Sequence, residues 1–187
     1  MTTNLRVLAI AGSLRRHSYN RSLLLAAAAM APTGMEVAVY DRLASIPLFN
    51  EDLEAENAAG PESVWRLREE VARADGLLFA TPEYNQSIPG VMKNVIDWLS
   101  RPGPEEVLEG KPVAVTGITA GRWGTRLAQT ALRQTLHATH ALVMPPALFI
   151  ADAKNHFDES GRLIDTSARE SLEELLNSLA AWIQRQS

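Results

Sequence analysis

Residues 12–21, with the sequence GSLRRHSYNR, bring hydroxyl, amide and guanidinium groups together in one short segment. They follow the apolar run 5–11, which is typical of a buried strand, and lead into the Ala- and Leu-rich segment 20–31, which is typical of a helix. The first N–H groups of a helix lack intrahelical acceptors and, with the helix dipole, favour an anion. The side-chain donors are those of Ser13, Arg15, Ser18 and Asn20. We therefore expect a group with about two negative charges here, such as a phosphate monoester.

This predicted phosphate loop differs from two familiar phosphate-binding motifs. The sequence has no G-x-x-x-x-G-K-[ST], and no G-x-G-x-x-G follows its first predicted strand. Gly12 permits a tight turn, and hydroxyl and amide side chains stand where those motifs use glycine backbone. The alternative interpretation is an ordinary helix start, capped by Ser18 and flanked by solvated arginines.

Two further loops carry residue types suited to a flat ligand. The first, TPEYNQSIPG at 81–90, has a rigid proline and Tyr84, whose ring offers an apolar face and a polar tip. Its free backbone groups could read the edge of a planar heterocycle, although an ordinary turn with an edge-packed tyrosine is the alternative. The second loop, TGITAGRWGT at 116–125, offers hydroxyls, a ring and glycines that permit close backbone approach. Its candidate residues are Thr116, Gly117, Thr119, Gly121, Trp123 and Gly124.

The elements that must position these loops alternate along the chain. Apolar runs typical of strands buried on both faces lie at 5–11, 35–41, 76–81, 112–118 and 141–150. Helical spacing is seen at 20–31, 61–75, 89–100, 124–140 and 166–186. This alternation predicts one α/β domain over 1–187, with a five-stranded parallel sheet of order 2-1-3-4-5 and helices on both faces. The loops after strands one, three and four should then share one edge.

The composition excludes several classes of function. The 187 residues include no cysteine, which rules out disulfides, thiol nucleophiles and thiolate metal sites. A net charge of −4 gives no general case for nucleic-acid binding. No apolar run approaches the ~18 residues of a membrane span, and the N-terminal residues do not resemble a signal peptide. We expect a globular cytoplasmic protein.

The segments GSLRRHSYNRSLL and TPEYNQSIPGVMKNVIDWLSRP, at this spacing, resemble the NADPH-dependent FMN reductase family. That family has a flavodoxin-like fold and includes chromate, quinone and azo reductases, and the resemblance extends over about residues 6–150. It implies FMN as cofactor and NADPH or NADH as hydride donor. The acceptor would be a small molecule: a quinone, an azo or nitro compound, chromate or free flavin. The resemblance also implies a homodimer or homotetramer with FMN near the subunit interface.

The same resemblance implies cofactor contacts by position. The FMN phosphate would be held by Ser13, the Leu14 backbone, Arg15, Ser18 and Asn20. The isoalloxazine ring would be lined, largely through backbone groups, by Pro82, Glu83, Tyr84 and Asn85. Thr119 and Gly121 would close the other side, although TGITAGRWG departs from the Ser-x-Gly…Gly-Gly often found there.

The flavin itself carries the chemistry in such enzymes, so no general acid or base and no metal is expected. Arg101 and Tyr84 are candidates on the substrate side, the alternative for Arg101 being a solvated arginine at a helix end. His137 and His140, three apart on one predicted helix, have no carboxylate within a neighbouring turn, which argues against a metal pair.

One predicted helix bears on assembly. It carries Val91, Met92, Val95, Trp98 and Leu99. This helix is more apolar than a single buried stripe requires, so we expect it to pack against a second subunit, with an entirely intramolecular core as the alternative. Lys93 and Asp97, four residues apart on the same helix, suit a surface ion pair or an intersubunit contact.

Three other functions compete with a reductase. A flavodoxin-type electron carrier would be far more acidic and would lack the arginine-bearing loop. A signalling receiver domain needs acidic residues after the first strand, where this chain has Gly12 and Ser13. A flavin-sensing regulator without turnover has no distinguishing sequence feature.

Overall fold

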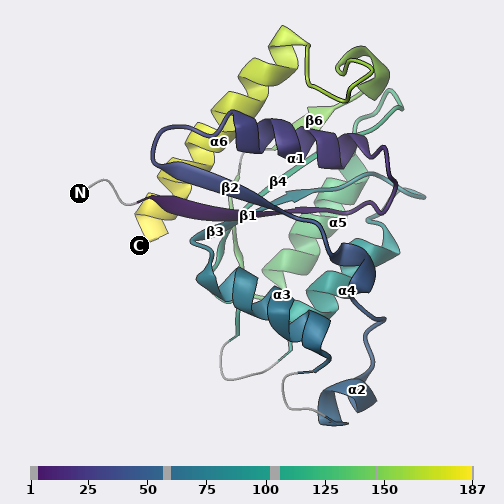
Figure 1. Ribbon diagram of the computed structural model, residues 1–187, viewed down its shortest axis with the longest axis vertical. Coiled ribbons are helices and arrows are strands. Elements are labelled where there is room, and N and C mark those ends of the chain that lie inside the picture. Colours follow the sequence, from purple (N-terminus) through teal and green to yellow (C-terminus); the bar gives the residue numbers. More distant parts are fainter. Residues whose placement is uncertain (1–3, 57–59, 102–105, 146, 187) are drawn as a thin grey trace.

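The computed structural model describes residues 4–56, 60–101, 106–145 and 147–186 (Figure 1). Its strands are β1 (Leu5–Ala11), β2 (Met35–Tyr40), β3 (Gly76–Ala80), β4 (Pro112–Ile118), β5 (Leu142–Val143) and β6 (Leu148–Ile150). Its α-helices are α1 (Tyr19–Ala29), α2 (Glu51–Glu56), α3 (Glu62–Arg73), α4 (Gly90–Leu99), α5 (Arg126–His137) and α6 (Thr166–Gln186). Two 3₁₀ turns, Leu43–Ser45 and Ala153–Asn155, lie in the loops after β2 and β6.

The strands form one parallel sheet in the order β2-β1-β3-β4-β5, which confirms the predicted order. The segment 141–150, expected as one strand, is instead divided into β5 and β6. Both pair with β4, β5 beside its start and β6 beside its end. The division lies at Pro145, which has no backbone N–H and cannot continue a hydrogen-bonded ladder.

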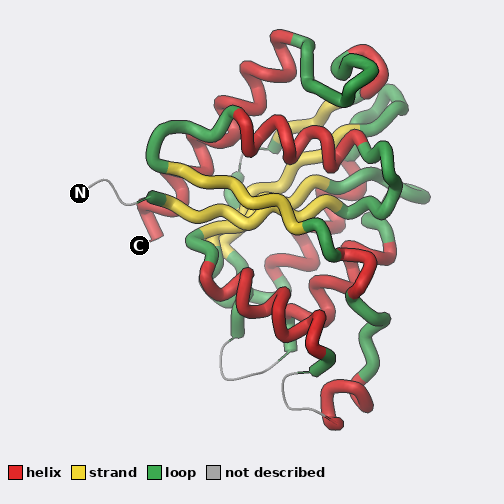
Figure 2. Tube along the Cα trace, viewed as in Figure 1, coloured by secondary structure: helices red, strands yellow, loops and turns green. Residues whose placement is uncertain are grey.

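Helices cover both faces of the sheet, as expected for a flavodoxin-like fold (Figures 1 and 2). On one face α1 and α6 bury leucines such as Leu24, Leu172 and Leu176 against β1 and β4. On the other face α3, α4 and α5 bury a second cluster that includes Leu67 and Trp98. Strands with side chains buried on both faces explain the continuous apolar runs in the sequence.

Helix α4 is buried by its own chain. Met92, Val95, Trp98 and Leu99 are at most 1% exposed, and the partly buried Val91 packs against the same core. The expectation that these side chains need a second subunit is therefore corrected: they complete the α3–α4–α5 core. A helix bounded by the sheet and two neighbouring helices has a wider buried face than one stripe.

No helix in the described parts of the chain is long and apolar enough to cross a membrane.

Candidate active site

The loops that follow β1, β3 and β4 meet at the carboxyl edge of the sheet, on the right in Figure 1. Backbone hydrogen bonds join them in pairs. The Gly12 N–H donates to the Ala80 carbonyl at 2.8 Å, and the Thr81 N–H donates to the Thr116 carbonyl at 3.0 Å. Ligands of open parallel sheets bind beyond such an edge.

The loop between β1 and α1 presents donors to solvent. The side chains of Leu14, Arg15, Arg16 and His17 are exposed. Within the described residues, the backbone N–H groups of Leu14, Arg16 and His17 have no acceptor, whereas the Arg15 N–H lies 3.4 Å from the Ser13 hydroxyl oxygen. Free amides beside two arginine side chains form a set of donors suited to an anion.

Ser18 ends this loop and caps α1. Its hydroxyl oxygen accepts from the Arg21 N–H at 3.3 Å, and the side chain is only 3% exposed. A hydroxyl also carries one hydrogen, and this bond does not use it. Ser18 can therefore cap the helix and donate to an anion at the same time, so the capping and phosphate-binding interpretations are compatible.

Asn20 is also buried and joins α1 to the end of β4. Its Nδ2 donates to the Ile118 carbonyl at 2.9 Å, and its Oδ1 accepts from the Ile118 N–H at 3.1 Å. The Asn20 side chain thereby makes the hydrogen bonds to the Ile118 backbone that a neighbouring strand would otherwise make. One Nδ2 hydrogen stays available, so a ligand contact is compatible with this bracing role, which the sequence does not reveal.

The loop after β3 forms a tight hairpin at its tip. The Tyr84 and Ser87 backbones exchange two hydrogen bonds of 3.0 Å, with Asn85 and Gln86 between them at φ of 51° and 64°. Positive φ at both central residues is the type I′ pattern. All four side chains are exposed, and Tyr84 has 47% of its surface open to solvent.

Glu83, just before this hairpin, has a role that sequence reasoning missed. Its Oε2 accepts from the backbone N–H groups of Leu127 and Ala128, at 2.9 and 3.0 Å. The side chain thus caps α5, whereas a contact to the ring, largely through backbone groups, was expected of this residue. The sequence does contain one indication of this role. Helix α5 has no acidic residue in its first turn, so a carboxylate that caps it has to come from another element.

The loop after β4 is braced by the residues that follow β6. The Thr119 N–H donates to Ile150, the Ala153 N–H donates to Thr119, and the Asp152 N–H donates to Gly121, at 3.1, 3.0 and 3.3 Å. A Cβ at Gly121 would meet only the Thr119 hydroxyl, at 3.9 Å, so this backbone is open to a neighbour.

Trp123 is the aromatic residue of this loop, and its ring is exposed. Its side chain is 68% exposed, and the Arg122 guanidinium lies 4.9 Å from the ring centroid. The pair offers a cation and a flat apolar face at the rim of the site.

Gly117 and Thr116 have roles other than those expected, and Gly12 has a second role beside its turn. A Cβ at Gly12 would lie 2.9 Å from Met92 Cε, and a Cβ at Gly117 would lie 2.2 Å from Thr125 Oγ1. Both glycines allow close packing inside the protein, and for Gly117 this replaces the expected approach to a ligand. At Gly12 the expected tight turn is also present, because the Ser13 N–H donates to the Ala11 carbonyl at 2.8 Å across it. The buried Thr116 hydroxyl donates to the Leu148 carbonyl and so faces β6.

Arg101 is engaged within the chain. Its Nε lies 3.0 Å from Glu54 Oε2, and its guanidinium carbon lies 5.3 Å from the Phe49 ring centroid. It follows the C-terminal end of α4, whereas the N-terminal end of that helix packs against Gly12. The helix length alone separates these ends by about 14 Å. In this chain Arg101 holds the segment before and within α2, and its substrate-side role stays a prediction.

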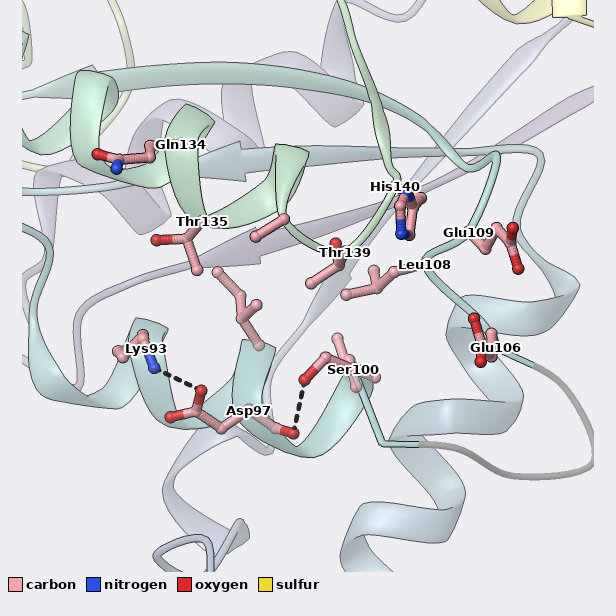
Figure 3. A pocket seen from close by; sticks show the side chains of 13 residues that line it. Lys93, Asp97, Ser100, Glu106, Leu108, Glu109, Gln134, Thr135, Thr139 and His140 are labelled. Carbon is pink, nitrogen blue, oxygen red and sulfur yellow. Dashed lines mark hydrogen bonds and ion pairs between the residues drawn. The ribbon is translucent and has the colours of Figure 1, made fainter.

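A separate cavity of about 530 Å³ lies between α4 and α5, away from the three loops. Figure 3 shows Lys93, Asp97 and Ser100 on one side and Thr135 on the other. Lys93 and Asp97 form the predicted ion pair, at 2.5 Å. His140 lines the same cavity. Within the described residues, no group of three or more histidine or acidic side chains is arranged to hold a metal ion.

The site suits a ligand with a phosphate and a flat ring. Free amides and arginines at the start of α1 match a phosphate, and the exposed hairpin and Gly121 backbone offer groups for a heterocycle. On a sheet of this order, such an edge defines a flavodoxin-like protein with a phosphate-bearing cofactor. The chain belongs to the NADPH-dependent FMN reductase family, whose model matches residues 5–156.

Several known proteins are similar in sequence or structure to this chain over almost its whole length. An NAD(P)H-dependent FMN reductase of Pseudomonas aeruginosa is 48% identical over 99% of this chain and 98% of its own. A quinone reductase of Pseudomonas putida is 40% identical over 95% and 94% of the two chains. The solved structure of the NAD(P)H:(acceptor) oxidoreductase FerB of Paracoccus denitrificans superposes with a TM-score of 0.84, at 31% identity, covering 97% of this chain and 98% of FerB.

Family membership confirms the class of enzyme expected from the resemblance. The protein is an NAD(P)H-dependent oxidoreductase with FMN as its cofactor. The residue-level contacts to FMN are predictions that the geometry supports.

Proposed function

We propose that this enzyme transfers hydride from NAD(P)H, through bound FMN, to a small quinone-type acceptor. FMN, when bound, takes up a hydride from the nicotinamide and passes it to the acceptor. The observation that carries the proposal is the loop between β1 and α1, where free amides and exposed arginines border a helix N-terminus beside the exposed hairpin.

The protein's own residues bind and orient the cofactor in this proposal. The phosphate is held by Ser13, the Leu14 backbone, Arg15, Ser18 and Asn20. Pro82, Glu83, Tyr84 and Asn85 form the loop along the ring, and Thr119 and Gly121 border its other side. Backbone N–H groups aimed at the ring edge would stabilise negative charge as it develops there.

Support for the acceptor class comes from the exposed side chains at the site and from the names of the relatives. A relative from Pseudomonas putida is named a quinone reductase, and FerB is named an acceptor oxidoreductase without a stated acceptor. Tyr84 and Trp123 are exposed rings at the rim, suited to stacking on a planar aromatic acceptor. Azo and nitro compounds, chromate and free flavin are further candidates for the same position.

The first experiment is an anaerobic titration of FMN-loaded protein with NADPH, followed by the visible absorption of the flavin. We expect bleaching by about one equivalent, because one hydride carries both electrons that the flavin accepts. Addition of a quinone should then restore the oxidised spectrum.

Other results would favour a different function. A bound flavin that stays oxidised would overturn the reductase and favour an electron carrier or a flavin sensor. Failure of the protein to retain FMN would overturn the proposed site. Parallel titration with NADH decides which nicotinamide cofactor reacts faster.

We also propose a homodimer or homotetramer with FMN near the subunit interface, located in the cytoplasm. Because the apolar side chains of α4 are used internally, support for assembly comes from the family resemblance. Light scattering after size-exclusion chromatography tests the assembly, and fractionation of cells tests the location.

A further inference from the structure

Glu83 links two parts of the site that are distant in the sequence. Its carboxylate extends from the loop after β3 to the first turn of α5, where one oxygen accepts from two backbone N–H groups at 2.9 and 3.0 Å. The partners, Leu127 and Ala128, lie 44 and 45 residues further along the chain.

Helix α5 depends on this carboxylate for its N-terminal cap. The residue at its own capping position, Thr125, makes no side-chain hydrogen bond to the helix start, and the first turn has no acidic residue. The first N–H groups of a helix need acceptors from elsewhere, and a negative charge there interacts favourably with the dipole. Glu83 supplies both from another loop.

The hairpin beside Glu83 has few other constraints. Tyr84 and Ser87 hydrogen bond to each other, and the side chains of residues 84–87 are exposed. In the described part of the chain, the Glu83 carboxylate makes the hydrogen bonds that connect loop 82–88 to a helix other than its own α4. Its loss would leave the hairpin attached only through its two ends.

We propose that Glu83 is a positioning residue: by capping α5 it holds the Tyr84–Ser87 hairpin at the distance from the loop after β4 that the flavin ring requires. The inference rests on the proposed flavin site and assigns to the side chain a task beyond lining that site. The carboxylate also accepts from the backbone N–H groups at the start of α5, so these groups are not free to bind the cofactor phosphate. The free N–H groups at the start of α1 are then the ones that bind it.

Two substitutions separate hydrogen bonding from charge. E83A removes the cap and releases the hairpin. E83Q keeps an oxygen that can accept from both N–H groups but removes the charge, so it should preserve much of the geometry.

D165A is a matched control for the loss of a helix cap. Asp165 caps α6 from the position just before the helix, its Oδ1 accepting from the Ala168 N–H at 2.8 Å and the Ser167 hydroxyl at 2.8 Å. It also lies 3.2 Å from His156 Nδ1. Asp165 is outside the three loops of the site, so D165A should lower stability without moving the hairpin.

The experiment measures the FMN dissociation constant of the four proteins by quenching of flavin fluorescence, at a temperature where circular dichroism shows all of them folded. We expect E83A to bind FMN about tenfold more weakly or worse, because FMN binding must then also fix the released hairpin. E83Q should stay within about threefold and D165A within about twofold of the unaltered protein. Steady-state kinetics with saturating FMN should show a raised KM for the quinone in E83A, because displacement of the hairpin moves the protein groups that contact the bound quinone.

The outcomes separate this inference from the proposed function. If the unaltered protein binds no FMN, the flavin site itself is overturned and the inference with it. If it binds FMN and E83A matches D165A in both affinity and KM, Glu83 only stabilises the fold and the inference alone is overturned. If E83A does not fold, E83D decides, because it keeps the charge but its shorter side chain changes the distance between the hairpin and α5. A raised quinone KM in E83D supports positioning, whereas values identical to D165A contradict it.

Discussion

Several single residues predicted to contact the cofactor also hold the surrounding elements. Ser18 caps α1, Glu83 caps α5, and Asn20 completes the hydrogen bonding of β4 at Ile118. A polar group buried at such a junction costs free energy unless each of its atoms finds a partner. These polar residues therefore make hydrogen bonds that stabilise the fold, and the donors that remain without a partner indicate which kind of ligand can bind.

Asn20 allows this double role to be measured. We expect N20A to lower the free energy of unfolding by about 2–4 kcal/mol, because the Ile118 N–H and carbonyl lose their partners in a buried position. Urea denaturation with and without FMN gives the value. The control is N155A, at an exposed asparagine, which should change stability by less than about 0.5 kcal/mol. Equal effects of the two substitutions would contradict the bracing role.

At the scale of elements, the segment between β6 and α6 makes hydrogen bonds both to the site and within itself. It braces the loop after β4 through Asp152 and Ala153. Further along, Asp158 organises a turn in which its Oδ1 accepts from the Ser160 N–H and hydroxyl and from the Arg162 N–H. The loop after β4 is thus braced by Asp152 and Ala153, and the turn organised by Asp158 is a separate local feature further along the segment.

This turn predicts a pH dependence at low pH. The Ser160 hydroxyl, then the Arg162 backbone N–H, lowers the pKa of Asp158 from 3.8 to about 2. Because the folded-state pKa is depressed, the stabilisation is complete above the unfolded value and is lost as the pH falls through about 2.

The measurement is the difference in Tm between the unaltered protein and D158N from pH 5 to pH 2. We expect this difference to shrink as the pH is lowered. E159Q, a change at the exposed neighbouring residue, is the control and should show no such trend. A difference for D158N that is constant over the range would refute the assignment.

At the scale of the whole molecule, one sheet joins two separate cores. Helices α1 and α6 enclose the first, and α3, α4 and α5 enclose the second. Successive residues of the central strands alternate between them: Ala9 belongs to the first core and Ile10 to the second. Displacing one layer of helices therefore exposes strands on which the other layer depends.

We expect residues 1–187 to unfold as one cooperative domain. Trp182 packs against the first core and Trp98 lies in the second, so single-tryptophan variants that keep one or the other report on each face. Their denaturation midpoints should coincide with each other and with the loss of helical circular dichroism. Two separate midpoints would show that the faces unfold independently.

Much of the architecture could be predicted from local patterns. Apolar runs, helical spacing and terminal residues such as Pro61 and Pro89 depend on neighbours within a few positions, so they indicate the helices and the strand order. The GSLRRHSYNR and TPEYN segments likewise identified the family, because the chemistry of a phosphate and a ring is carried by short contiguous motifs.

Other features were decided only when distant segments met. The burial of α4 within one chain, the engagement of Arg101 with Glu54, the capping of α5 by Glu83 and the close packing of Gly117 against Thr125 all join residues from different elements. A residue type specifies which hydrogen bonds a side chain can make, but the partner that satisfies it is selected by tertiary packing. For that reason local sequence predicts where this protein binds its cofactor, whereas the folded structure determines which residues hold that site in place.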